Sequence, residues 1–236
     1  MLAVYRYELK RYLVTPIGYV FMGAFLLMSG LLFFFYNLTY YSNDMISLFS
    51  DMTSFLMFLI PVLTMRSFAE ERKNRSDQFL FTAPVSVHGI VMGKMLAAVT
   101  VYLITLLFTL VDVAIIGRYG TVYWGEIAVG YLGFFLLSTC YISSGLMLSA
   151  LCENQLSAAV LTFGVHFLFS AVDWIVQAVP SRLVRAVLEG ASLYTRFKDV
   201  QRGVLSLNSC VYFCSVTMLF LYLTTLILRA RRRSKK

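Results

Sequence analysis

The sequence predicts an all-α integral membrane protein that crosses the bilayer six times. Of its 236 residues, 59% are hydrophobic and only 14% are charged, whereas a soluble domain has roughly 25% charged residues. The apolar residues form runs long enough for a helix to cross about 30 Å of hydrocarbon. We expect one transmembrane domain over residues 1–236, with spans at residues 17–38, 45–65, 95–116, 127–151, 156–179 and 208–228.

The distribution of lysine and arginine predicts a multi-pass protein of the plasma membrane with both termini in the cytoplasm. Residues 1–15, 66–94 and 229–236 carry three, five and six basic residues. On the opposite side, Arg118 and five basic residues of segment 180–207 make six. The side with more basic residues is the cytoplasmic one. Because the basic residues lie at the ends of apolar runs, the net charge of +8 indicates membrane topology and not nucleic-acid binding.

The first fifteen residues predict an amphipathic helix at the membrane surface. Leu2, Tyr5 and Leu9 recur at helical spacing among basic residues, and Pro16 ends or kinks the helix. A signal peptide is the alternative, but the apolar run that follows is too long and has no small-residue cleavage site. Segment 180–207, on the outer side, has a pattern typical of one or two short amphipathic helices.

Segment 66–94 is the most polar stretch between two spans. Seven charged residues fall between Arg66 and Asp77, and each would cost about 2.5–3.5 kcal/mol at the centre of a membrane helix. The segment is far longer than a simple connection, which favours a docking surface over an ordinary solvated loop. We expect its charges to orient a partner and the apolar turn 79–81 to anchor that partner.

The end of this segment is close to a phosphate-binding loop but does not match one. Gly89 and Gly93 are one residue too close together, and Met95 follows Lys94 where the motif requires Ser or Thr. We therefore expect no nucleotide or other cofactor on this chain. Gly93 is expected to allow close helix packing, and Lys94 to extend its ammonium group to the lipid headgroups.

Three ionisable residues fall within predicted spans and are candidates for an intramembrane polar site: Asp112, His166 and Asp173. Such residues serve as proton relays or substrate contacts. The alternative is structural, since the two aspartates lie near the outer interface and a neutral histidine can bind a neighbouring helix. Two histidines do not predict a metal site. The sequence contains no catalytic motif and the four cysteines form no Cys-x-x-Cys pair, so we expect no enzyme activity.

Two stretches resemble the ABC-2-type transporter permeases, most closely the branch for gliding motility and copper-reductase maturation. The first runs from Glu70-Glu71-Arg72-Lys73 through Phe79-Leu80-Phe81-Thr82-Ala83-Pro84-Val85-Ser86 to Gly93-Lys94. The second is Phe197 with Arg202-Gly203-Val204, ahead of the last span. The chain departs from the family pattern at Arg75-Ser76, where Gly-Thr is usual, and at Phe79 and Phe81, where Leu is usual.

The resemblance implies the transmembrane subunit of an exporter, working as a homodimer or heterodimer with ABC ATP-binding subunits that hold ATP and Mg. Residues 1–15 would be an interfacial elbow helix, segment 66–94 would contain a cytoplasmic coupling helix, and segment 180–207 would form re-entrant helices. The implied ATPase-docking residues are Glu70, Glu71, Arg72, Arg75, Phe79, Leu80, Phe81 and Pro84.

Two hypotheses from other classes stay open on the sequence. An ion-coupled secondary transporter would use Asp112, His166 and Asp173, and a membrane assembly scaffold would not transport at all. The long charged loop and the lack of acid pairs deep in the spans favour the ABC permease over the ion-coupled transporter.

Overall fold

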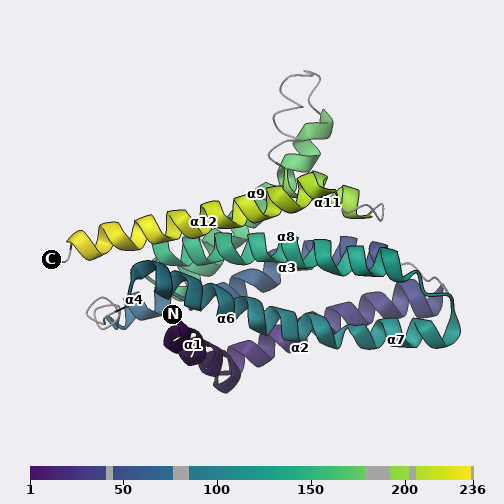
Figure 1. Ribbon diagram of the computed structural model, residues 1–236, viewed down its shortest axis with the longest axis horizontal. Helices are drawn as coiled ribbons and strands as arrows, with labels where there is room; N and C mark the ends of the chain where they lie inside the picture. The colour runs from purple at the N-terminus through teal and green to yellow at the C-terminus, as the bar shows by residue number, and fades with distance from the viewer. Residues whose placement is uncertain (41–44, 77–84, 179–191, 202–205, 235–236) are drawn as a thin grey trace.

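The computed structural model describes residues 1–40, 45–76, 85–178, 192–201 and 206–234, and every regular element among them is helical (Figure 1). The elements are α1 Leu2–Val14, α2 Pro16–Phe33, the π-helix η1 Phe34–Thr39, α3 Met45–Thr64, α4 Ala69–Lys73, α6 Val87–Phe108, α7 Leu110–Tyr119, α8 Trp124–Leu151, α9 Gln155–Ala178, α11 Leu193–Gln201 and α12 Leu207–Ser234.

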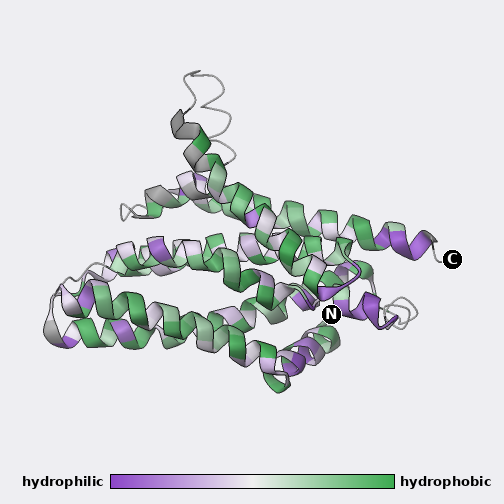
Figure 2. Cartoon of the chain, turned by 180° about the vertical axis from the view of Figure 1, so that it is seen from behind, coloured by the Kyte–Doolittle hydropathy of each residue, from purple (hydrophilic) through white to green (hydrophobic). Residues whose placement is uncertain are grey.

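Among the described residues, six helical stretches are long and apolar enough to cross a membrane, which confirms the all-helical, six-span prediction. Figure 2 shows hydrophobic residues along the length of these helices, with hydrophilic residues concentrated in α1, near α4 and at the C-terminal end of α12. These three regions lie toward the same end of the bundle (Figure 1). The chain is therefore a multi-pass membrane protein with its most polar elements gathered at one end.

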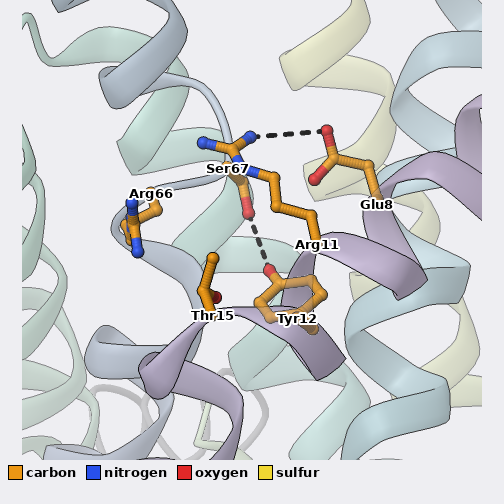
Figure 3. A pocket seen from close by; sticks show the side chains of 6 residues that line it. All are labelled: Glu8, Arg11, Tyr12, Thr15, Arg66 and Ser67. Carbon is orange, nitrogen blue, oxygen red and sulfur yellow. Dashed lines mark hydrogen bonds and ion pairs between the residues drawn. The ribbon is translucent and has the colours of Figure 1, made fainter.

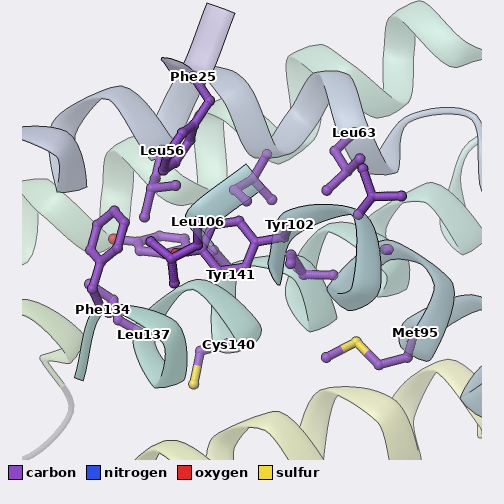
Figure 4. Close-up of a cluster of buried hydrophobic side chains, with 14 of the residues drawn as sticks. Phe25, Leu56, Leu63, Met95, Tyr102, Leu106, Phe134, Leu137, Cys140 and Tyr141 are labelled. Atoms are coloured by element: carbon purple, nitrogen blue, oxygen red, sulfur yellow. The ribbon is translucent and has the colours of Figure 1, made fainter. Parts of the chain in front are cut away.

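Helix α8 is the most buried of the six spanning helices and forms the centre of the bundle. Aromatic and aliphatic side chains of α2, α3 and α6 pack around it (Figure 4). Its small side chains also reach four neighbouring elements by hydrogen bonds, in which Ser138 contacts Tyr102 of α6, Cys140 contacts Phe213 of α12, Ser144 contacts His166 of α9, and Ser149 contacts Met65 after α3. Small side chains permit the close approach of helices that these bonds need.

Two helices extend beyond the expected spans. Helix α6 begins at Val87 and not at residue 95, because the Ser86 side chain accepts a hydrogen bond from the Gly89 amide at 3.1 Å and caps the helix. Lys94 consequently lies two turns inside the helix. Helix α12 continues beyond residue 228 through Arg231, Arg232 and Arg233, because arginine has a high helix propensity.

Helix α11 belongs to the segment expected on the outer side, and it packs into the bundle. Its side chains Leu193, Phe197 and Val200 are buried, and the ring centre of Phe197 lies 6.4 Å from that of Phe134 in α8. One of the expected short helices is therefore present. The rest of the expected second motif, residues 202–204, lies outside the described residues.

The corner between α1 and α2 depends on a close backbone contact. Pro16 is the first residue of α2, where its missing N–H costs no hydrogen bond. A Cβ atom at Gly18 would lie 2.2 Å from the carbonyl oxygen of Tyr12, so only glycine fits where α1 folds back. This contact sets the direction of α1, which then packs along the first half of α6 (Figure 1).

We predict that Gly18→Ala displaces α1 and destabilises the protein by about 1–3 kcal/mol, the usual cost of overpacking. The matched control is Gly23→Ala on the same helix, where an added Cβ meets nothing within 4 Å. Thermal unfolding of both purified variants in one detergent measures the difference. Equal midpoints for Gly18→Ala and Gly23→Ala would contradict the assigned role of this corner.

Candidate functional site

The centre of the candidate site is the ammonium group of Lys94, which is buried with only 1% of the residue exposed. Its Nζ donates hydrogen bonds to Glu8 Oε1 at 2.6 Å, to Glu71 Oε1 at 2.6 Å and to the Ser67 carbonyl at 2.7 Å. An ammonium group has three N–H donors, and all three are used. The expectation that Lys94 extends to the headgroups is therefore wrong, because two carboxylates lie within reach inside the protein.

Gly93 has no side chain, and this allows α1 to approach α6 closely enough for the Glu8 carboxylate to reach Lys94. A Cβ atom at Gly93 would lie 3.0 Å from Cβ of Val4 and 3.2 Å from the Tyr5 amide nitrogen. The backbone of α1 therefore lies directly against α6 at this point, in agreement with the close packing expected for Gly93. One turn later on α1, Glu8 points at the lysine of the facing helix.

A second layer of charges surrounds Lys94. Arg66 binds both carboxylate oxygens of Glu70, at 2.7 and 2.6 Å, in the two-pronged geometry that suits arginine. Arg11 donates to Glu70 and lies 3.6 Å from Glu8. We call Glu8, Arg11, Arg66, Glu70, Glu71 and Lys94 the charge cluster; its three acidic and three basic side chains balance, which limits the cost of removing them from water.

Tyr12 closes the cluster on the side of α3. Burial raises the pKa of its phenol, which stays protonated and donates to the Leu63 carbonyl at 3.0 Å. The same hydroxyl lies 3.1 Å from Ser67 Oγ. Figure 3 shows Tyr12 directed at Ser67 and Arg11 directed at Glu8 around a small pocket.

The start of α4 is fixed by a serine of another helix. Ser149, in the last turn of α8, accepts hydrogen bonds from the amides of Phe68 and Ala69, both at 3.2 Å. Phe68 is the N-cap residue and its own side chain makes no capping bond. Ser149 therefore supplies from across the bundle the acceptor that a cap residue normally provides, and it ties α4 to the central helix.

Arg72 holds the other side of α4 against the turn between α8 and α9. Its guanidinium group donates to the Leu151 carbonyl at 3.2 Å and pairs with Glu153. Arg231 of α12 donates to the same Leu151 carbonyl at 3.1 Å. The ends of α4, α8 and α12 thus meet at one backbone carbonyl.

These contacts attach α4 to three helices of the bundle. Helix α4 is joined to α1 and α6 through the charge cluster and to α8 through Ser149. Within the described part of the chain, no group of three or more His, Cys, Asp or Glu side chains is placed to hold a metal ion.

The structure distributes the expected docking residues over different surroundings. Glu71 is buried and Glu70 is largely covered, and both carboxylates bind basic groups of this chain. Arg72 is half-buried, and Arg75 is exposed with a positive φ of 55°. Phe79, Leu80, Phe81 and Pro84 lie outside the described residues.

Four members of the site were not predictable from the motifs in the sequence: Glu8, Arg11, Arg66 and Ser149. Lys94 was expected to bind lipid headgroups and binds Glu8 and Glu71 instead. One signal was present: Glu8 is the only acidic residue among the first fifteen. An anionic membrane surface repels an acidic side chain. The presence of Glu8 on a basic surface helix therefore favours a partner inside the protein.

In the described part of the chain, two of the three intramembrane candidates, Asp112 and His166, have hydrogen-bond partners on different helices. Asp112 in α7 lies 3.5 Å from Ser29 of α2 and is half-buried. His166 in α9 is fully buried, with Nε2 2.9 Å from Ser144 of α8. Ser144 Oγ also lies 2.8 Å from the Tyr141 carbonyl, to which it donates. Asp173 lies in α9, but its side chain is outside the description.

We predict that Lys94→Met destabilises the protein by about 3–5 kcal/mol, because two carboxylates stay buried without their cation. Adding Glu8→Gln and Glu71→Gln removes both charges and is expected to restore much of the lost stability. Thermal unfolding in detergent compares the two variants, with Lys10→Met, an exposed lysine of α1, as control. If the triple variant unfolds more easily than Lys94→Met, the charges are not what sets the stability of this site.

Comparison with known families assigns the chain to a family of membrane transporters. A family model described as "ABC-2 family transporter protein" matches residues 34–188, well over half of the chain. No curated protein is similar enough to the chain to count as a relative. The matched region begins late in the first span and covers α3, α4, the polar segment that follows, and α6 to α9. The chain therefore belongs to the ABC-2 transporter family and is a transmembrane permease of the ABC type.

Proposed function

We propose that the chain is the membrane subunit of an exporter in which a separate ATP-binding subunit binds ATP and Mg and drives substrate movement through a dimer of permease subunits. The family assignment supports this function. The observation that carries it is the attachment of α4, through buried ion pairs, to helices α1 and α6. Within the family, we favour the branch for gliding motility and copper-reductase maturation, because the residues of segment 70–94 resemble it.

The coupling helix lies in segment 66–85, and its residues divide into two groups. Glu70 and Glu71 bind basic groups of this chain and hold α4 in place. Lys73 and Arg75 are exposed and present positive charge beyond α4. Together with Arg72, they are the charges proposed to set the orientation of the ATPase, and the apolar residues Phe79, Leu80 and Phe81 are proposed to anchor it.

The end of the bundle that carries α4 faces the cytoplasm of the plasma membrane. Contacts of Arg72 and Arg231 with Leu151 bring α4 and the basic end of α12 together, and α1 lies near them in Figure 1. Basic residues favour the cytoplasmic side. In this arrangement α1 is the elbow helix, both termini are cytoplasmic, and α11 is part of a re-entrant segment at the outer side.

Coupling follows from the contacts of α4. When ATP binding moves the partner, the partner displaces α4, and the displacement passes through the charge cluster to α1 and the base of α6. The Ser149 contacts pass it to α8 as well. Because buried ion pairs are costly to break, α1, α4 and α6 move as one unit.

We predict that Lys73→Glu with Arg75→Glu abolishes co-purification of the ATPase subunit encoded or expressed with this chain. Both side chains are exposed, so the thermal stability of the permease should not change. The matched control is Arg118→Glu, which changes an exposed arginine in the last turn of α7. Pull-down from gently solubilised membranes measures the amount of bound ATPase.

ATPase recovery and thermal stability together distinguish a loss of ATPase docking from a loss of permease folding. Loss of the ATPase in the Lys73/Arg75 variant alone, at unchanged thermal stability, is the expected result. Full recovery of the ATPase with that variant would show that α4 is not the docking surface. A wild-type chain that retains no ATPase under any mild condition, yet transports under a proton gradient, would contradict the proposed function itself.

A further inference from the structure

The basic end of α12 continues the outward face of its membrane-spanning part. Exposed apolar side chains of this helix include Val211, Met218, Tyr222 and Leu226, which are 40–66% exposed and recur at spacings of about one or two turns. Such a stripe on a spanning helix faces lipid. Arg229 and Arg233 follow at the next two positions of the same stripe, and both are exposed.

The contact of Arg231 with α8 determines the direction in which Arg229 and Arg233 point. Arg231 donates to the Leu151 carbonyl of α8 and therefore faces the bundle. Residues two positions before and after it on an α-helix point to roughly the opposite side, at about 100° per residue. Arg229 and Arg233 consequently point away from α8, in the direction that the lipid-facing residues share.

The depth of these arginines matches that of the headgroups. Residues 207–228 form about 33 Å of helix, close to the thickness of the hydrocarbon core. Arg229 therefore follows directly where the helix leaves the hydrocarbon, and Arg233 lies one turn further. Within the described part of the chain, neither arginine forms an ion pair with a carboxylate.

We propose that Arg229 and Arg233 form a binding surface for the phosphate headgroups of anionic phospholipids. Guanidinium groups bind phosphate oxygens through paired N–H donors, and basic residues next to a span attract anionic lipid. An acidic partner protein is the less favoured occupant, because the two arginines continue the lipid-facing stripe and not the face that α12 turns toward α8 and α4. This inference does not depend on the ATPase.

The test uses the full chain, purified alone in mild detergent, with a fluorescent phosphatidylglycerol as probe and phosphatidylcholine as the zwitterionic comparison. We expect Arg229→Gln with Arg233→Gln to weaken phosphatidylglycerol binding about 25-fold, or roughly 5-fold per arginine. Phosphatidylcholine binding should not change. Arg229→Lys with Arg233→Lys keeps the charge and should retain most of the affinity.

The matched control is Lys73→Gln with Arg75→Gln, which removes the same charge from the last residue of α4 and from the residues that follow it, at the same end of the bundle. It should leave phosphatidylglycerol affinity within about 2-fold of the wild type, since these side chains do not belong to the α12 stripe. Equal phosphatidylglycerol affinity of the wild type and Arg229→Gln/Arg233→Gln would overturn the proposal. Unchanged phosphatidylglycerol binding, together with a lower recovery of ATPase in a separate pull-down of that variant from solubilised membranes, would also overturn it, in favour of an acidic protein surface.

Discussion

The arrangement of α1, α4 and the start of α6 depends on the hydrogen bonds of the buried Lys94 ammonium group. Removing a charged group from water costs several kcal/mol, and the cost is offset only where partners with good geometry surround the charge. Lys94 has three such partners, one on α1, one on α4 and one on the segment between α3 and α4. Each of these elements must be in place for the lysine to be buried.

The charge cluster contributes more to geometry than to stability. A buried ion pair is often no more stabilising than apolar residues of the same volume, but breaking it leaves an uncompensated charge. Intermediate positions of α1 or α4 relative to α6 would separate charges in a medium of low polarity and are therefore disfavoured. The proposed function requires this property, because a loosely attached α4 would absorb a movement of the partner before it reached the spans.

Contacts at the two ends of α4 complete this attachment. Ser149 holds its first amides, and Arg72 holds its far side to the Leu151 carbonyl. The last turn of α8 is therefore involved in both. The C-terminal end of α8 is connected to α4, and the rest of α8 packs against the other spans.

The spans were predictable because hydropathy and helix length act within one stretch of sequence, and residues 17–38 and 127–151 show this well. The partners of Lys94 were not predictable in the same way, since Glu8 lies 86 residues away and reaches Lys94 only because Gly93 lets α1 approach. The early start of α6 at Val87 also mattered, because it places Lys94 inside a helix and not at its end. Glu70 and Glu71 were predicted to dock the ATPase, and in the structure both bind basic groups of this chain. Whether an acidic residue faces a partner or its own chain depends on helix direction, which spacing alone does not determine.

Hydrogen exchange of Lys94→Met, measured by mass spectrometry in the same detergent as the wild type, tests the central claim most directly. If Lys94 joins the three elements, peptides from α1 and from residues 66–76 should both exchange faster, while the middle of α8 and the control variant Lys10→Met stay unchanged. Faster exchange in residues 66–76 with α1 unaffected, or no change in either, would contradict the claim that this lysine holds α1, α4 and α6 together.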